Sequence, residues 1–494
     1  MNASSKRWSF VILLTLIAMV VAGCSPSGAS NNQQAPNAPA GAATTAPAGM
    51  ATTAPTTGGA TAGASSAITG TGTISGTTGQ TANAPVAPLA PANIQLPSTC
   101  SNVQIEYWTP FTGPDGPFMR KLVDQFNAAN PKIKANFVTQ PNYVTKMSTA
   151  AASNTLPDLA SINEDQVATM AYNHVIRPIP DNLLTQLGVG ADNFPKAAWQ
   201  VGQVAGKQYA IPLSMVEMAM YYNQDLLQKA GITTPPANAA DFAKAAAAMT
   251  SGNTHGFIIT TGFPVQQIFQ QLLHQYGGTE FNADTTQATW NSDAGVKALQ
   301  WMKDAQGKYS QPKLPVDADL NAFKAGQAGM IWNGIWQLAN VTGSGVSFKS
   351  GATATPMIGT QPAAWAGASL FALPMHKGNA DPCKDTASIM LMRYVLDHSA
   401  DWAGAGNIPA LNSVRHGAQF GSQQPFASIA PEVENPVFLP AGVPGVADAF
   451  APLMDAVSAV MTGSATDMKG TLDSAANKAN QILAQNKQKY GSAP

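Results

Sequence analysis

One long stretch of this chain cannot form a folded core, and it decides where the fold begins. No Asp, Glu, Lys or Arg occurs between Arg7 and Glu106, and residues 25–98 are almost entirely Ala, Thr, Pro, Gly, Ser, Asn and Gln. Such a segment buries too little apolar surface to offset its ordering entropy, so we expect a disordered tether over residues 24–99, with a reach of about 50 Å. About 395 residues remain for the folded body, which suits two lobes better than one core.

The N-terminus has the pattern of an export signal. Lys6 and Arg7 precede an apolar run that is too short for a final membrane span and ends in Val21-Ala22-Gly23-Cys24. This ending resembles the lipobox of bacterial lipoproteins, in which the cysteine is acylated and becomes the mature N-terminus. The resemblance implies a signal peptide over residues 1–23, lipidation of Cys24 and an extracytoplasmic protein anchored to the cell membrane. An ordinary secretory signal with a chance cysteine is the alternative.

The composition excludes several classes of protein. The formal net charge of -1 gives no basic surplus for nucleic acid, and no second apolar segment approaches membrane-spanning length. Besides Cys24 the chain has only Cys100 and Cys383, and an even pair in an oxidising compartment favours a disulfide. Two buried reduced thiols are the alternative. The six histidines are dispersed without metal-ligand spacing, so we expect neither a metal nor another cofactor.

Beyond Cys100, short apolar strands alternate with amphipathic helices, which is typical of an α/β protein. The pattern predicts strands at residues 103–108, 133–138 and 158–162, with helices at 118–129 and 143–153 between them. This βαβαβ order favours a largely parallel sheet. Later helices are predicted at residues 241–249, 264–276, 293–303, 317–325, 384–396, 449–461 and 465–488.

A series of short motifs runs in order through this body. They follow the first strand and helix and are Leu156-Pro157-Asp158, Gly206-Lys207-Gln208-Tyr209-Ala210-Ile211-Pro212, Tyr221-Tyr222-Asn223-Gln224-Asp225-Leu226-Leu227, Phe323-Lys324-Ala325-Gly326-Gln327-Ala328-Gly329-Met330, Asn333-Gly334-Ile335-Trp336 and Ala405-Gly406-Asn407-Ile408-Pro409-Ala410. Together they resemble the extracellular solute-binding proteins of ABC sugar importers, of the maltose-binding type. The resemblance implies an α/β, two-lobed periplasmic-binding-protein-like fold with a hinge and an interlobe ligand cleft.

The same resemblance implies the bounds of the two lobes, the ligand and the partner proteins. Lobe 1 would comprise residues 100–214 and 363–412, and lobe 2 residues 215–362 and 413–490. Cys100 and Cys383 would then share lobe 1, where a bridge between them would not restrain closure. The implied ligand is a carbohydrate, and the implied partners are the permease subunits of an ABC importer. We expect a monomer without catalytic activity.

Aromatic residues are the first candidates for the ligand site, because the C–H face of a sugar stacks on aromatic rings. The resemblance places Trp336 and Trp365 in contact with ligand, and Trp108 at the end of the first strand, where a core role is equally open. Trp332 could point either way. Phe450 matches another stacking position, but its apolar helix favours core burial.

Polar candidates complete the predicted site. Asp165 follows the third strand, where it would bind ligand hydroxyls or cap the next helix. Glu217 follows the Pro212-Leu213-Ser214 crossing, one position away from the acidic ligand of the family. Gly262-Phe263-Pro264 stands where the maltose-binding type carries a Glu-Pro-Tyr stretch, and Phe263 and Gln266 are candidate lining residues. This departure, with Thr109-Pro110-Phe111 in place of an expected acidic-basic pair, argues that the ligand is not maltose.

Two other functions stay open at this stage. A secreted glycoside hydrolase would combine tryptophans with two carboxylates about 5–10 Å apart, but no recognisable catalytic motif occurs. A binding protein for a peptide, a polyamine or a metal is the other alternative. Abundant lysine or histidine near the cleft would have favoured a metal, and it is absent.

Overall fold

The structure is a computed structural model, and it describes residues 89, 92, 94–378, 380–423, 429 and 437–491. Cys24, the predicted signal peptide and the predicted tether up to residue 88 lie outside the described residues. In the part of the chain that the structure describes, no helix is both long and apolar enough to cross a membrane. Within the same residues, no group of His, Cys, Asp and Glu side chains is placed to hold a metal ion.

Three parallel strands open the folded body. β1 (Val103–Thr109) pairs in parallel with both β2 (Ile133–Thr139) and β3 (Leu159–Asn163). Helices α1 (Asp115–Ala129) and α2 (Tyr143–Ser153) connect them, so the predicted βαβαβ order is confirmed. Successive side chains of β1 and β2 alternate between buried and exposed, because a strand turns them to opposite faces.

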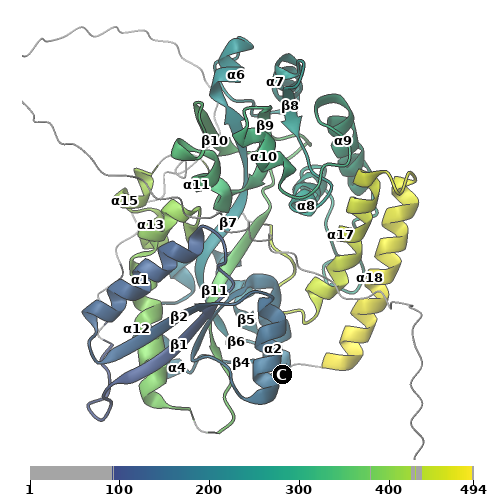
Figure 1. The fold of residues 1–494 in the computed structure, drawn as a ribbon. Coiled ribbons are helices and arrows are strands. Elements are labelled where there is room, and N and C mark those ends of the chain that lie inside the picture. The colour runs from purple at the N-terminus through teal and green to yellow at the C-terminus, as the bar shows by residue number, and fades with distance from the viewer. Residues whose placement is uncertain are drawn as a thin grey trace, which may run out of the picture. The chain divides into compact units, whose positions relative to one another are not determined.

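The sheet is not largely parallel beyond these strands, and that expectation is wrong. β7 (Ala210–Asn223) and β11 (Ala366–Pro374) pair antiparallel with each other, and β11 also pairs antiparallel with β3. A helical crossover of the βαβ kind makes the strands that it joins parallel. These strands are not joined in that way, so they run in opposite directions. Figure 1 shows β7 and β11 running side by side through the middle of the body.

β7 joins two regions of the sheet. Its first half, Ala210 to Glu217, pairs with β11, whereas Met218 to Tyr222 pair with β9 (Ala328–Gly334). β9 in turn pairs in parallel with β8 (His255–Ile258). The strand order is β2-β1-β3-β11-β7-β9-β8. The remaining strands are β4 (Ile176–Arg177) on β11, β10 (Ser350–Ala354) and β12 (Ile408–Pro409) on β7, and the separate pair β5 (Gln203–Val204) and β6 (Lys207–Gln208).

Helices cover both regions. The longer ones match the predicted periodicity and are α7 (Ala239–Met249), α8 (Val265–Gln275), α9 (Asp293–Tyr309), α12 (Pro382–Asp397), α17 (Val446–Thr462) and α18 (Met468–Tyr490). The shorter ones are α3 (Val167–Tyr172), α4 (Asp181–Leu187), α5 (Lys196–Val201), α6 (Gln224–Lys229), α10 (Ala318–Lys324), α11 (Leu338–Val341), α13 (Ser399–Trp402), α14 (Asn412–Arg415) and α15 (Ala418–Gly421). Single 3-10 turns are η1 (Glu164–Gln166), η2 (Ala191–Asn193), η3 (Ile335–Gln337), η4 (Gly343–Gly345) and η5 (Ala403–Ala405).

Two separate hydrophobic cores underlie this arrangement. The first is built on β1, β2, β3, β11, α1 and α12, and it also takes in one face of β9 and α10. The second is built on α7, α8, α9, α17 and α18 against the other face of β7 and β9. The α/β fold class is therefore confirmed, with β7 contributing to both cores.

A disulfide joins Cys100 to Cys383, which are 283 positions apart in the chain. Cys100 precedes β1, and Cys383 lies in the first turn of α12. The side chain of Asp381 caps this helix by accepting hydrogen bonds from the backbone N–H groups of Cys383 and Lys384. The bridge thus fixes the start of the first parallel strand to a helix that packs on the same core.

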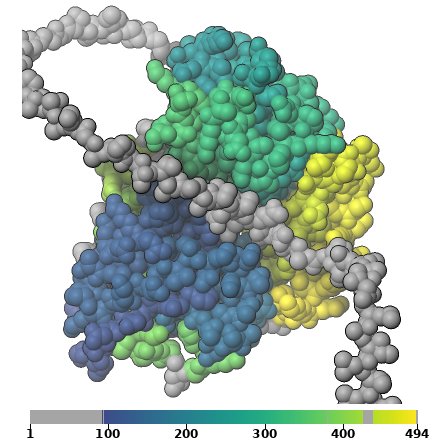
Figure 2. Space-filling model, viewed as in Figure 1, coloured from purple at the N-terminus to yellow at the C-terminus, as the bar shows by residue number. Residues whose placement is uncertain are grey.

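The C-terminal helices contact elements from both parts of the body. Thr169 of α3 accepts a hydrogen bond from the N–H of Gly445 at the start of α17 (2.8 Å), and Tyr172 meets Tyr490 of α18 edge to face. α17 also packs on α8 and α9. Figure 2 shows the yellow surface of these helices beside both the blue surface of the first elements and the teal surface of the middle ones.

Candidate functional site

Trp336 stands at the carboxyl end of β9, held by the residues just before it. Asn333 accepts a hydrogen bond from the N–H of Gly334 through its own side chain (2.8 Å), and the Tyr221 hydroxyl donates to the Gly334 carbonyl (2.8 Å). A Cβ atom on Gly334 would lie 2.0 Å from the Trp336 ring. A side chain at position 334 would therefore displace the indole, which folds back over the end of its own strand.

The motif around Gly406 packs against the backbone next to Trp336. Gly406 has φ +85°, and a Cβ atom on it would lie 2.0 Å from the Ile335 carbonyl oxygen. Asn407, next in the chain, accepts a hydrogen bond from the Ser214 hydroxyl of β7 (3.0 Å). Three motifs that are far apart in sequence, around Ser214, Trp336 and Gly406, thus meet at one place.

Trp336 is the centre of a group of three half-buried rings, which we call the aromatic cluster: Phe263, Trp336 and Trp365. The ring centroids of Phe263 and Trp336 are 5.9 Å apart with planes at 32°, and those of Trp336 and Trp365 are 6.2 Å apart at 79°. Phe263 lies between β8 and α8, and Trp365 lies just before β11. Rings brought together from three segments are suited to stack on the apolar faces of a sugar.

A carboxyl group lies beside this cluster. Glu164 of η1 accepts a hydrogen bond from the N–H of Ala368 in β11 (2.8 Å). A Cβ atom on Gly367 would lie 3.2 Å from the Trp365 ring and 3.6 Å from a carboxyl oxygen of Glu164, so both groups flank this glycine. Burial, with the neighbouring charge of Asp165 second, raises the pKa of Glu164 to about 8. A protonated carboxyl at this point can donate a hydrogen bond as well as accept one.

Asp165 is a predicted site residue, whereas its neighbour Glu164 is not. Burial raises the pKa of Asp165 as well, and the nearby carboxylate of Asp448 in α17 adds to this. The position of Glu164 directly after a parallel strand, where α/β proteins place ligand-binding groups, is the signal that could have found it.

Two predicted site residues are core residues in the structure. Trp332 is 1% exposed and stacks on Trp301 of α9, with centroids 5.3 Å apart and planes at 17°. Phe450 is 6% exposed and meets Trp290 edge to face. The structure instead packs both rings in the second core, where they fill space between helices and the sheet.

The remaining candidates have mixed surroundings. Trp108 is the last residue but one of β1 and is partly buried on the first core, and its indole N–H donates to Glu106 (3.0 Å). Glu217 of β7 faces Ala366 of β11 in the sheet register and is fully buried. Gln266 is buried in the first turns of α8. Trp108 and Gln266 share no ring contact or hydrogen bond with the aromatic cluster in the part of the chain described here.

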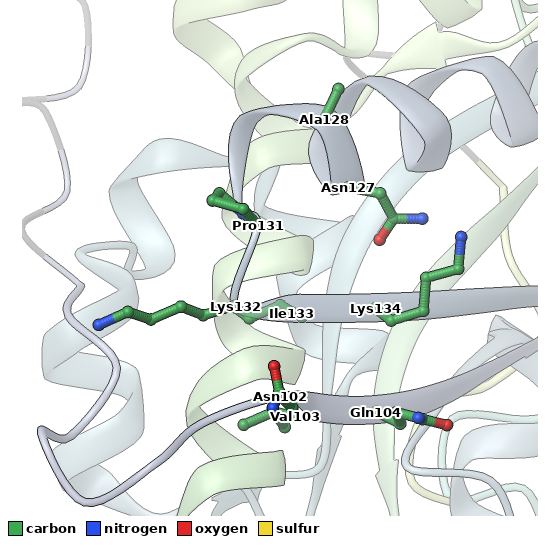
Figure 3. Close-up of a pocket in the computed structure, with 9 residues that line it drawn as sticks. All are labelled: Asn102, Val103, Gln104, Asn127, Ala128, Pro131, Lys132, Ile133 and Lys134. Carbon is green, nitrogen blue, oxygen red and sulfur yellow. The ribbon is translucent and has the colours of Figure 1, made fainter.

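A surface hollow of about 510 Å³ lies elsewhere, at the amino ends of β1 and β2. Figure 3 shows the side chains that line it, among them Asn102, Asn127, Lys132 and Lys134. None of the predicted site residues borders this hollow. Open α/β sheets bind ligands at the carboxyl ends of their parallel strands, so we assign no ligand site to it.

Comparison with known proteins finds relatives of this chain among binding proteins. A Brucella abortus protein named only as a binding protein is 28% identical over 260 residues, which are 50% of this chain and 61% of that protein. The maltotriose-binding protein of Pyrococcus abyssi is 21% identical over 250 residues, 50% of this chain and 53% of that protein. The match thus spans between about half and three fifths of the length of these curated relatives.

Solved structures show the fold over a longer range. The ABC substrate-binding protein of Listeria monocytogenes in complex with cycloalternan has a TM-score of 0.67 and 22% identity, over 78% of this chain and 99% of that one. The sequence profile of the bacterial extracellular solute-binding proteins matches residues 121–425. This range includes η1, the aromatic cluster and the Gly406 motif. The chain belongs to the bacterial extracellular solute-binding protein family.

Proposed function

We propose that the protein is the substrate-binding subunit of an ABC importer and captures an oligosaccharide at the aromatic cluster. The observation that carries the proposal is the meeting of Phe263, Trp336 and Trp365, flanked by the carboxyl group of Glu164. Aromatic faces with a few polar groups beside them are what a pyranose ring requires. The family membership makes capture and delivery, rather than storage or signalling, the expected use of such a site.

The ligand class follows from chemistry and from the relatives together. The Pyrococcus relative is named for maltotriose, and the Listeria structure is a complex with cycloalternan. In this chain the expected acidic-basic pair after β1 is replaced by Thr109-Pro110-Phe111. We therefore propose a neutral oligosaccharide other than maltose, held by stacking more than by charge.

Closure of two lobes would trap this ligand. We propose lobe 1 as residues 100–214 and 363–412 and lobe 2 as residues 215–362 and 413–490, joined by β7 and by the segment before β11. Phe263 and Trp336 then belong to lobe 2 and Glu164 to lobe 1. Trp365 lies at the junction, just inside the lobe 1 bounds, and its ring packs on the second core. A ligand between them contacts both lobes and stabilises the closed state.

To deliver a sugar to an importer, the protein must be held at the membrane and must contact the permease subunits. The lipobox-like ending at Cys24 supports a lipid anchor, and the charge-free segment after it supports a flexible tether of about 50 Å reach. The folded body would then present its bound sugar, as a monomer, to the permease subunits of the importer.

A binding screen tests the proposal. Thermal shift and calorimetry are run against maltotriose, cycloalternan, maltose, amino acids and polyamines, with Trp336→Ala as the matched control. We expect stabilisation by an oligosaccharide that the variant loses, and chromatography should recover that sugar intact. Stabilisation by a polyamine or amino acid alone would reject the sugar assignment, and consumption of the sugar would reject the non-catalytic one.

A further inference from the structure

Helix α8 buries an unusual number of polar side chains. Gln266, Gln270, Gln271 and Gln275 are all at most 8% exposed, although glutamine is mostly found at protein surfaces. A buried amide is costly unless its donors and acceptors are paired. The partners of these glutamines therefore indicate what the helix holds in place.

Gln275 ties together both ends of the segment 355–365, which leads from β10 to β11. Its side-chain nitrogen donates to the carbonyls of Pro356 (3.3 Å) and Ala363 (3.4 Å). Its side-chain oxygen accepts from the N–H groups of Ile358 (2.7 Å) and Gly359 (3.2 Å). One side chain thus makes four hydrogen bonds to the backbone of this segment.

Gln271, one turn earlier, repeats the pattern. Its side-chain nitrogen donates to the hydroxyl of Thr355, and its side-chain oxygen accepts from the backbone N–H of Trp365 (3.4 Å). These two residues are the first and the last of the segment. The two glutamines therefore close the segment on itself and fasten it to α8.

The same helix borders the aromatic cluster at its other end. Phe263 precedes α8 by two residues, and its ring faces Trp336. Trp365, whose backbone N–H donates to Gln271, meets Trp336 edge to face. Both neighbours of Trp336 are thus placed by α8, one through the chain and the other through the glutamines.

We propose that Gln271 and Gln275 are positioning residues for the ligand site, which set the place of Trp365 against Trp336 without touching ligand. This inference rests on the proposed function for its effect on affinity. Removing the Gln275 amide takes these partners from four backbone groups of the segment, and removing the Gln271 amide takes them from the Thr355 hydroxyl and the Trp365 backbone N–H. The segment then relaxes and the Trp365 ring leaves its edge-to-face contact. The energy of stacking a ligand on that ring is then lost.

The test compares Gln271→Met and Gln275→Met with Gln270→Met. Gln270 lies on the same helix and is equally buried, but its side chain donates to Glu280 (3.1 Å) and does not bond to the segment. We expect the first two variants to weaken oligosaccharide binding by about 5- to 100-fold, the range for an unpaired buried polar group. The control should retain wild-type affinity even where its thermal stability falls.

A second measurement separates positioning from the proposed function. In protein labelled with 5-fluorotryptophan, the fluorine resonance of Trp365 is assigned by its loss in Trp365→Phe. It should shift in Gln271→Met and Gln275→Met and stay in place in Gln270→Met, with or without maltotriose. If wild-type protein binds no oligosaccharide, the proposed function fails, and this spectrum still decides the inference. The inference is overturned if the Trp365 resonance stays in place in both variants. It is also overturned if both variants keep wild-type affinity while Trp365→Ala loses affinity.

Discussion

The indole of Trp336 meets the indole of Trp365 edge to face, with ring centroids 6.2 Å apart, although one residue follows β9 and the other precedes β11. Trp336 follows β9, which runs beside the second half of β7, and Trp365 precedes β11, which runs beside the first half. The contact therefore lies where β7 passes from one core to the other. The ring of Trp365 packs on the second core at this place.

Truncating the cluster should reduce binding more than stability. We expect Trp336→Ala and Trp365→Ala each to weaken oligosaccharide binding by about 2–4 kcal/mol, because aromatic anchors dominate desolvated sites. Trp332→Ala is the matched control, since its ring is in the second core. It should instead lower the free energy of unfolding by about 3–5 kcal/mol. Calorimetry and denaturant unfolding of the same three proteins distinguish the outcomes, and a Trp336→Ala protein with full affinity would contradict the site.

The different fates of Trp332 and Trp336 show what the sequence could not decide. Strand alternation would place residues 332, 334 and 336 on one face, but β9 ends at Gly334 and the chain turns into η3. Trp332 thus faces the core, while Trp336 folds back over the strand end. The position of a strand end depends on pairing with β7, a segment more than 100 residues earlier by the numbering.

Other parts of the site were predictable to different degrees. The motifs around Ser214, Gly334 and Gly406 could be found singly, and the structure explains them jointly, since each supports Trp336. The glutamines of α8 could be predicted only as helical residues, because their partners Thr355 and Trp365 lie 84 and 94 positions away. Long-range hydrogen bonds leave no periodic signal in a single sequence.

Gly406→Ala should disturb both stability and binding. Its φ of +85° already disfavours a side chain, and a Cβ would collide with the backbone of Ile335. Gly252→Ala is a suitable control, because Gly252 also has positive φ (+58°) but no atom within 4 Å of the added carbon. We expect the control to cost about 1–2 kcal/mol from backbone strain alone. Gly406→Ala should lower the free energy of unfolding by clearly more than this and should also lower the affinity for sugar. Equal unfolding curves for the two variants would show that the contact with Ile335 does not affect stability.

The Cys100–Cys383 bridge should stabilise the body. Because it closes a loop of 283 residues, the Cys100→Ser/Cys383→Ser double variant should lose on the order of 3–5 kcal/mol of unfolding free energy. Thiol titration of the denatured, non-reduced wild-type body should find neither cysteine free. Sugar affinity should be unchanged, since the bridge lies within one proposed lobe. Two titratable thiols in that body would reject the bridge.

Membrane attachment should depend on Cys24. The Cys24→Ser protein should be released into the soluble fraction, because the acyl chains can form only on the cysteine side chain and its new N-terminus. The released protein should bind the same oligosaccharide as the anchored one, because the site is in the body. Continued sedimentation of Cys24→Ser with membranes in high salt would contradict a lipid anchor.

Glu164 should make stability fall as pH rises. Its pKa is raised to about 8 in the folded protein, from a usual value of 4.5, mainly by burial. Below that usual value both folded and unfolded states hold the proton, and the group adds no pH dependence. Between the two values the unfolded state releases the proton while the folded state keeps it, so the free energy of unfolding decreases with pH and levels off above the folded pKa.

Glu164→Gln should remove this part of the pH dependence, since glutamine keeps the acceptor for the Ala368 N–H and cannot ionise. Denaturant unfolding at intervals from pH 5 to 8 should therefore show the variant gaining on wild type as pH rises. Asp124→Asn, which removes an exposed carboxylate of α1, controls for the change in net charge. Parallel curves for wild type and Glu164→Gln would mean that the carboxyl is ionised in the folded protein, and a neutral hydrogen-bond donor beside Trp365 would have to be abandoned.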